Sequence, residues 1–127
     1  MKIVFDTSIL IDNLRGGKVG DAIFDSIQEQ NAEFFIPTIV IYELFSGKSA
    51  ENPKVLDHIK NLIKRFKRVE LTEEIAKRAG ELYRETGKTF GPQDYIIAAT
   101  TMEIGGTILT LNKKHFAQIP GLPLYPI

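Results

Sequence analysis

Cysteine is absent from this 127-residue sequence, and histidine occurs only at His58 and His115. The lack of cysteine excludes disulfide bonds and thiolate metal sites, which leaves carboxylate oxygens and two imidazoles as metal ligands. Hard divalent cations suit that set of ligands best. No apolar run approaches the roughly 20 residues of a membrane span, and the N-terminus lacks the residue order of a signal peptide. We therefore expect a cytoplasmic protein with no membrane segment.

A net charge is also absent, because sixteen basic residues balance sixteen acidic ones. Any binding of nucleic acid must therefore depend on a local cluster of cations. The densest basic run spans residues 60–68, but a solvated helix face also explains it. The length suits one domain, and no repeat, linker or low-complexity segment divides the chain. We expect a single domain over residues 1–127.

Strand and helix signals alternate along the chain. Short apolar stretches predict strands at residues 3–5, 34–36, 68–71 and 107–111, and a last edge strand within residues 122–127. Apolar periodicity predicts helices over 19–30 and 55–66, one after Pro37, one capped by Thr72, and a largely apolar one from Pro92 to Gly105. Strands separated by helices are typical of a three-layer α/β/α domain. We expect a mainly parallel central sheet of four to five strands.

Three acidic residues are predicted near one edge of this sheet. Asp6 follows the first strand, Glu43 lies one turn into the helix after the second, and Asp94 lies in the first turn of the largely apolar helix. Ligand chemistry collects at the carboxyl ends of parallel strands. Taken singly, Asp6 and Asp94 are explained by helix N-termini, and Glu43 by a helix face that meets water. Taken together, the acids repel one another, and a divalent cation among them would offset that cost.

Three segments resemble the successive signature segments of PIN-domain ribonucleases, namely "FDTSILID", "IPTIVIYELFSG" and "GPQDYIIAATTMEIGGTILTLNKKHF". The likeness is greatest to the VapC-type toxins of prokaryotic toxin–antitoxin pairs, and it covers essentially the whole chain. It implies a Mg²⁺- or Mn²⁺-dependent endoribonuclease that acts on RNA, with Asp6, Glu43 and Asp94 as its metal-binding acids. It also implies an antitoxin partner and a homodimer. The polar neighbours that it assigns to the site are Thr7, Ser8 and Thr110.

One position departs from the fullest form of the family pattern. Members often carry a fourth acid where this chain has Asn112, although many toxin-like members also have asparagine there. A neutral oxygen at Asn112 reduces the charge available for a second cation, which favours a single metal. His115 stays outside the predicted core site, because a histidine beside an aromatic residue in a turn is structural more often than catalytic. Candidate RNA contacts are Lys88, Lys113 and Lys114.

The mechanism expected from these residues uses water, since the sequence offers no Ser–His or Cys–His pair for a covalent intermediate. Hydrolysis would leave a 5′-phosphate and a 3′-hydroxyl. Two alternatives stay open. The first is a catalytically silent PIN-like scaffold that binds RNA or protein, which Asn112 favours. The second is an aspartate-dependent phosphatase, which would require a second aspartate at the position of Ser8.

The stretch "TIVIYELFSG" holds more apolar surface than one helix face can bury in its own domain. We therefore expect part of it to be exposed and to mark an interface. The family resemblance adds an antitoxin segment near the acids. An arginine in such a segment would inhibit by pairing with the three carboxylates in place of the cation.

Overall fold

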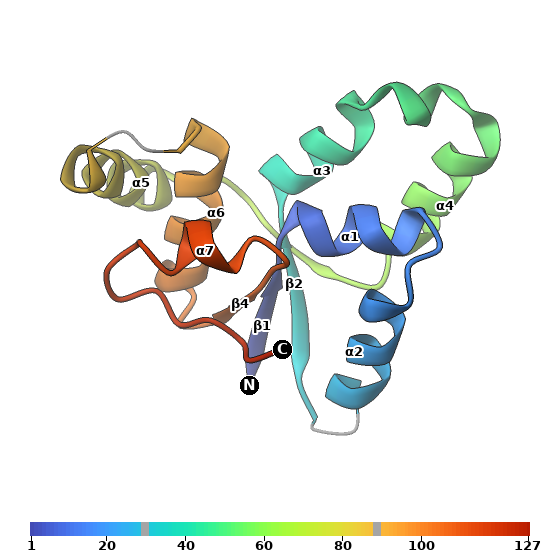
Figure 1. Cartoon of the computed structure of the whole chain (residues 1–127). Coiled ribbons are helices and arrows are strands. Elements are labelled where there is room, and N and C mark those ends of the chain that lie inside the picture. Colours follow the sequence, from blue (N-terminus) through green and yellow to red (C-terminus); the bar gives the residue numbers. More distant parts are fainter. Residues whose placement is uncertain (29–30, 88–89) are drawn as a thin grey trace.

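The computed structural model describes residues 1–28, 31–87 and 90–127. Figure 1 shows how their helices and strands are arranged. In chain order these are β1 (Lys2–Phe5), α1 (Thr7–Leu14), α2 (Lys18–Gln28), β2 (Glu33–Pro37), α3 (Thr38–Ser46), the 3₁₀ helix η1 (Lys48–Glu51), α4 (Pro53–Ile63), β3 (Lys67–Val69), α5 (Glu73–Thr86), α6 (Pro92–Glu103), β4 (Thr107–Leu109) and α7 (Lys113–Phe116).

The strands of the described chain form one parallel sheet in the order β3-β2-β1-β4. In the centre, Ile3 of β1 pairs with Phe34 of β2 on one side and Thr107 of β4 on the other. Helices α5 and α6 lie to one side of the sheet, and α1, α2 and α4 lie to the other (Figure 1). This three-layer α/β/α arrangement confirms the predicted fold class.

Aromatic side chains fill the space between the sheet and helices α2 and α4. The ring of Phe5 lies 4.9 Å from that of Phe24 and 4.8 Å from that of Phe66, measured between centroids. Arg65 of the basic run packs on this layer, because its guanidinium lies 4.4 Å from the centre of the Phe24 ring. Lys67 pairs with Glu33 of the neighbouring strand at 2.6 Å. These contacts favour the structural explanation of the basic run.

Several predicted boundaries are confirmed. Pro92 is the first residue of α6, and Pro37 directly precedes α3. The hydroxyl of Thr72 accepts a hydrogen bond of 3.2 Å from the backbone N–H of Ile75, which caps α5. Helix α6 is buried as its apolar composition predicts, since its side chains from Ile97 to Thr101 are almost inaccessible to solvent. No helix in the described ranges is both long and apolar enough to cross a membrane.

The predicted last edge strand is wrong. The C-terminal segment makes only an isolated parallel bridge between Leu124 and Ile108 of β4. Two hydrogen bonds hold it, from Ile108 N–H to the Pro123 carbonyl at 2.9 Å and from Tyr125 N–H to the Ile108 carbonyl at 2.8 Å. Pro123 and Pro126 have no N–H to donate, so the pairing cannot extend into a ladder. The third strand also begins one residue earlier than predicted and ends at Val69.

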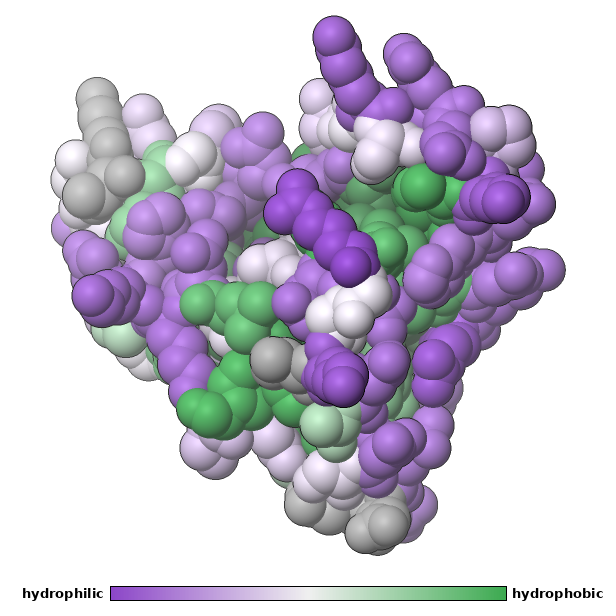
Figure 2. Space-filling view, turned by 45° about the vertical axis from the view of Figure 1, so that its right-hand side comes forward, coloured by the Kyte–Doolittle hydropathy of each residue, from purple (hydrophilic) through white to green (hydrophobic). Residues whose placement is uncertain are grey.

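The surface between α1, α3 and α4 is hollowed. Figure 2 shows hydrophobic residues gathered in this hollow, with hydrophilic side chains around it. The lining residues come from α1 and the residue after it, from α3 and the segment after it, and from Val55 of α4.

Candidate functional site

The three predicted acids lie on elements that meet at the carboxyl ends of the strands. Asp6 stands between β1 and α1, Glu43 is on α3, which begins directly after β2, and Asp94 is in the first turn of α6. Asp6 is extended, with φ −78° and ψ 157°, and occupies the N-cap position of α1. Its carboxylate makes no capping hydrogen bond, however. A cap therefore does not explain why a buried strand ends in an acid.

Asp6 instead accepts two hydroxyl hydrogen bonds on one oxygen, although it is only 4% exposed. Ser8 Oγ donates to Asp6 Oδ2 at 2.8 Å, and Thr110 Oγ1 donates to the same atom at 2.7 Å. Each hydroxyl is held in turn by a backbone N–H, Ser8 by that of Leu111 at 3.0 Å and Thr110 by that of Asn112 at 2.8 Å. This chain of donors fixes the carboxylate through Oδ2, and none of the hydrogen bonds among the described residues uses its other oxygen, Oδ1.

Glu43 faces the same region from α3. Thr7 Oγ1 donates to Glu43 Oε1 at 2.8 Å and so ties the start of α1 to α3. Partial burial raises the pKa of Glu43 above its ordinary value, and the charges of Asp6 and Asp94 raise it further against the opposing effect of Thr7. The three acids are therefore close enough to disfavour one another's charged forms.

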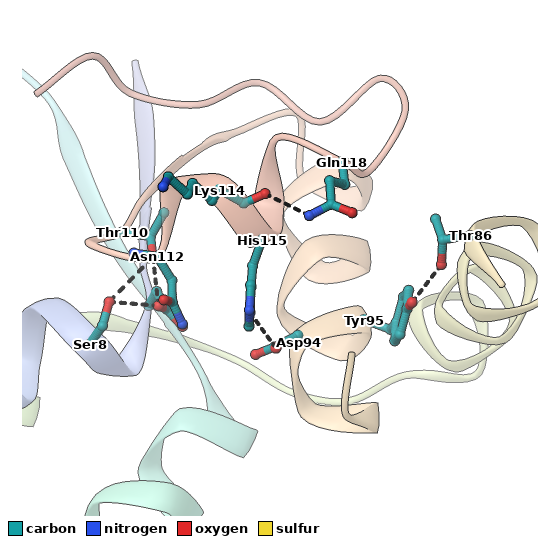
Figure 3. Close-up of polar contacts among 10 residues, drawn as sticks. Ser8, Thr86, Asp94, Tyr95, Thr110, Asn112, Lys114, His115 and Gln118 are labelled. Carbon is teal, nitrogen blue, oxygen red and sulfur yellow. Dashed lines mark hydrogen bonds and ion pairs between the residues drawn. The ribbon is translucent and has the colours of Figure 1, made fainter. Parts of the chain in front are cut away.

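Asp94 is the third member, and it has a partner on α7. Partial burial, followed by the charge of Asp6, raises the pKa of Asp94, whereas His115 opposes that rise. The Nδ1 atom of His115 lies 3.7 Å from Asp94 Oδ2, and the two side chains point toward each other (Figure 3). The imidazole also packs on the Phe90 ring, with 4.7 Å between ring centroids.

The donor set suits a hard divalent cation, because it consists of carboxylate oxygens supported by hydroxyls. Partial burial raises the pKa of both Glu43 and Asp94, and the charges of the neighbouring acids add to that rise. A cation among the acids would offset both effects. Within the described ranges, no three Asp, Glu or His side chains already converge closely enough to hold a metal ion. Binding would therefore require the partly exposed carboxylates of Glu43 and Asp94 to turn toward Asp6.

The remaining predicted site residues differ in exposure and in what they contact. Asn112 is exposed at the start of α7, beside Thr110 (Figure 3). The Lys113 ammonium contacts the backbone oxygen of Ile127. The Lys114 side chain is exposed and does not point toward Asp94 (Figure 3). Lys88 lies outside the described residues.

His115 is the residue at this site that the sequence alone did not place in the core. The signal available was its position three residues after Asn112, in the short helix that follows β4. Because β4 runs parallel to its neighbour β1, the helix that follows β4 lies near the carboxyl ends of the strands. Only the packing of α7 against the first turn of α6 shows that the imidazole faces Asp94.

The fold is that of a known family. The profile of the PIN domain matches residues 3–122. Ribonuclease VapC1 of Rickettsia felis is 30% identical in an alignment that covers 100% of this chain and 97% of that protein. Ribonuclease VapC19 of Mycobacterium tuberculosis is 29% identical, with coverage of 96% and 97%. The chain belongs to the PIN-domain family and, within it, to the VapC ribonucleases.

A solved structure supports the same fold. The chain is similar to a protein chain in the crystal structure of VapBC2 from Rickettsia felis bound to a DNA fragment from their promoter, with a TM-score of 0.82. The match covers 98% of both chains at 23% identity. At that identity the similarity speaks for the fold alone.

Proposed function

We propose that this protein is an endoribonuclease that hydrolyses RNA with the help of Mg²⁺ or Mn²⁺, and that it is the toxin of a toxin–antitoxin pair. The observation that carries the proposal is the position of Asp6, Glu43 and Asp94 at the carboxyl edge of a PIN-domain sheet, near enough for the charge of Asp6 to raise the pKa of the other two acids beyond the effect of burial. Membership among the VapC ribonucleases supports the substrate class. The reaction requires access to cellular RNA, so we assign the protein to the cytoplasm.

Each acid has a distinct role in this proposal. Asp6 and Asp94 hold the cation, and Asp6 is suited to this because Ser8 and Thr110 already fix its carboxylate. Glu43 holds or orients the attacking water. The raised pKa of Glu43 makes its carboxylate a better proton acceptor than an ordinary glutamate. His115 is a positioning residue that restrains Asp94.

When bound, a divalent cation would lower the pKa of water and neutralise charge on the scissile phosphate. The chain supplies the geometry around that chemistry. The Thr7 hydroxyl donates to Glu43 of α3, and the hydroxyls of Ser8 and Thr110 donate to Asp6. Water attack in line with the leaving oxygen yields a 5′-phosphate and a 3′-hydroxyl. Asn112 adds no negative charge, so one cation is the expected resting state.

Chelation tests the proposal directly. We expect excess EDTA to stop cleavage of RNA by the purified protein, and added Mg²⁺ or Mn²⁺ to restore it. End analysis of the fragments should find 5′-phosphates. Cleavage that continues in excess chelator would exclude metal-dependent chemistry. A protein that binds RNA and cleaves none with either metal would instead favour the silent scaffold.

The partner proposal makes a separate, competitive prediction. An antitoxin arginine inserted among Asp6, Glu43 and Asp94 would satisfy the carboxylates that otherwise hold the cation. Inhibition should therefore weaken as the metal concentration rises. A series of cleavage assays at fixed antitoxin and increasing Mg²⁺ would measure this effect. Inhibition that is indifferent to Mg²⁺ would contradict an arginine at the metal site.

A further inference from the structure

The imidazole of His115 is an aromatic surface at the edge of the proposed metal site. Its Nδ1 atom lies 3.7 Å from Asp94 Oδ2, toward which the side chain points (Figure 3). Helix α7, which carries His115, follows β4, whereas α3 follows β2, and these two strands lie on opposite sides of β1. The imidazole therefore borders the acids on a different side from the hollow between α1, α3 and α4.

One face of this imidazole is supported and the other is open. The His115 and Phe90 rings lie 4.7 Å apart between centroids, with an angle of 38° between their planes. Phe90 is itself largely buried and packs on the ring of Tyr95, at 5.7 Å between centroids. The His115 side chain is nevertheless 48% exposed. Because Phe90 covers one face and Asp94 lies at an edge, the exposed part of the imidazole includes its other face.

Anchoring of α7 does not account for this arrangement. The next residue, Phe116, is fully buried and attaches the short helix to the core. A half-exposed imidazole adds little to that anchoring, because the free energy of burial follows the apolar area removed from water. Its packing on Phe90 instead holds the ring in one orientation. A ring that is already held loses little conformational freedom when a ligand stacks on it.

We propose that His115 is a stacking platform for the RNA base next to the scissile phosphate, with Phe90 as its support. This rests on the proposed ribonuclease function and names how one base of the substrate is held. Single-stranded RNA is bound largely by stacking of its bases on aromatic side chains, histidine included. Asp94 is a proposed ligand of the cation that neutralises the phosphate, so a ring at its edge lies within reach of the neighbouring base. Since every base has a flat face, the platform would hold the strand without selecting its sequence.

A tryptophan reporter tests the stacking directly. The chain contains no tryptophan, so His115→Trp introduces a single indole, whose fluorescence a stacked base should quench. The matched control is His58→Trp, at the other histidine of the chain, which is exposed on α4. The probe is a short single-stranded RNA of mixed sequence, added in EDTA so that it stays intact. We expect quenching in His115→Trp and none in His58→Trp, and equal responses in the two variants would overturn the platform.

Two further substitutions separate the ring from its contact with Asp94. His115→Asn keeps a nitrogen near the position of Nδ1 but removes the ring, whereas His115→Phe keeps a ring without either nitrogen. In EDTA, anisotropy of the fluorescein-labelled RNA should show about tenfold weaker binding to His115→Asn, the scale of losing one stacked base, and no loss for His115→Phe. Affinity for Mn²⁺, measured by calorimetry, should show the reverse. It should stay near the wild-type value in His115→Asn and fall about tenfold in His115→Phe, which no longer restrains Asp94.

The salt dependence of RNA binding distinguishes a stacked base from a phosphate contact. Stacking on the imidazole releases no counterion, so His115→Asn should keep the wild-type slope of log affinity against log salt. A slope that is smaller by about 0.7 would identify the imidazole as a phosphate ligand and overturn the platform. His115→Asn introduces a smaller side chain at a half-exposed position, so it keeps the proposal testable if His115→Trp or His115→Phe does not fold.

The outcomes separate the platform from the activity. If the wild type cleaves RNA but His115→Asn binds it as tightly as the wild type does, the platform is wrong and the ribonuclease proposal stands. If the wild type neither binds nor cleaves RNA with either metal, the ribonuclease proposal itself fails. Weaker RNA binding by His115→Asn, with Mn²⁺ affinity retained, would support both proposals.

Discussion

The Asp6 carboxylate is held by hydroxyls from both ends of the chain. Ser8 lies two residues after it, whereas Thr110 lies 104 residues away. Both hydroxyls donate to Oδ2, so the orientation of this buried acid is set before any ligand arrives. Glu43 and Asp94 are partly exposed and less restrained. We therefore regard Asp6 as the fixed point of the site and the other two acids as its movable members.

Removal of a charge at Asp94 should stop catalysis without unfolding the protein. Loss of a residue that merely supports a metal ligand typically costs 10–100-fold in activity, and a direct ligand should cost more. We expect Asp94→Asn to lower RNA cleavage by more than about 100-fold, with a thermal midpoint no lower than that of the wild type. Fragment analysis and circular dichroism measure the two. Full cleavage by a folded Asp94→Asn protein would contradict the proposed mechanism.

Addition of a charge at Asn112 should have the opposite effect on metal binding. A carboxylate there would offer another ligand beside Thr110, so Asn112→Asp should raise affinity for Mn²⁺ and favour a second ion. Gln118→Glu adds the same charge at an exposed position further along the chain and serves as the control. Calorimetry gives affinity and stoichiometry. If both quantities match the wild type in Asn112→Asp, residue 112 does not face the metal.

The raised pKa values of Glu43 and Asp94 predict how stability depends on pH without metal. Above the ordinary pKa values of 4.5 and 3.8, the folded protein still holds protons that the unfolded chain has released. The free energy of unfolding should therefore fall as pH rises through the window between the ordinary and raised values. Thermal melts in EDTA across this range measure it. Glu43→Gln should flatten the fall, while Glu85→Gln, an exposed acid on α5, should leave it unchanged.

Among the elements, those with a local chemical signal were predictable from the sequence. Pro92 and Thr72 mark helix starts because a missing N–H and a capping hydroxyl act within one turn. The position of the acids at one sheet edge was predictable because Asp6 follows β1, whereas Glu43 and Asp94 lie on helices that begin at that edge. The contact of His115 with Asp94 was not, since it depends on how α7 packs on α6. The bridge at Leu124 also depends on tertiary pairing that proline limits.

The Thr72 cap gives a prediction at the scale of one helix. Thr72→Ala removes the acceptor for the N–H of Ile75 and should lower the free energy of unfolding by about 1 kcal/mol. For a domain of this size, that loss corresponds to a fall of about 4 °C in the thermal midpoint. Thr72→Ser keeps the hydroxyl and should lose much less. RNA cleavage well below the midpoint should be unaffected in both, because α5 carries none of the three proposed metal-site acids.

For the whole molecule, α3 points to assembly. Val40 and Leu44 are buried, but Tyr42 is 60% exposed and Phe45 is 38% exposed, which confirms that part of this apolar stretch faces outward. We expect a homodimer at micromolar concentration that uses this patch. Sedimentation should show the dimer, and Tyr42→Glu with Phe45→Glu should shift it to monomer. A wild-type monomer at these concentrations would contradict the prediction.

The sheet order has a consequence for the protein during its own synthesis. Strand β1 is made first, yet one of its two neighbours is β4, and the Thr110 hydroxyl that holds Asp6 follows that strand directly. A chain still growing on the ribosome therefore carries an incomplete site until residues 107–112 have emerged. We expect nascent chains to be inactive. The messenger RNA that encodes the protein is thus safe from the chain being translated from it.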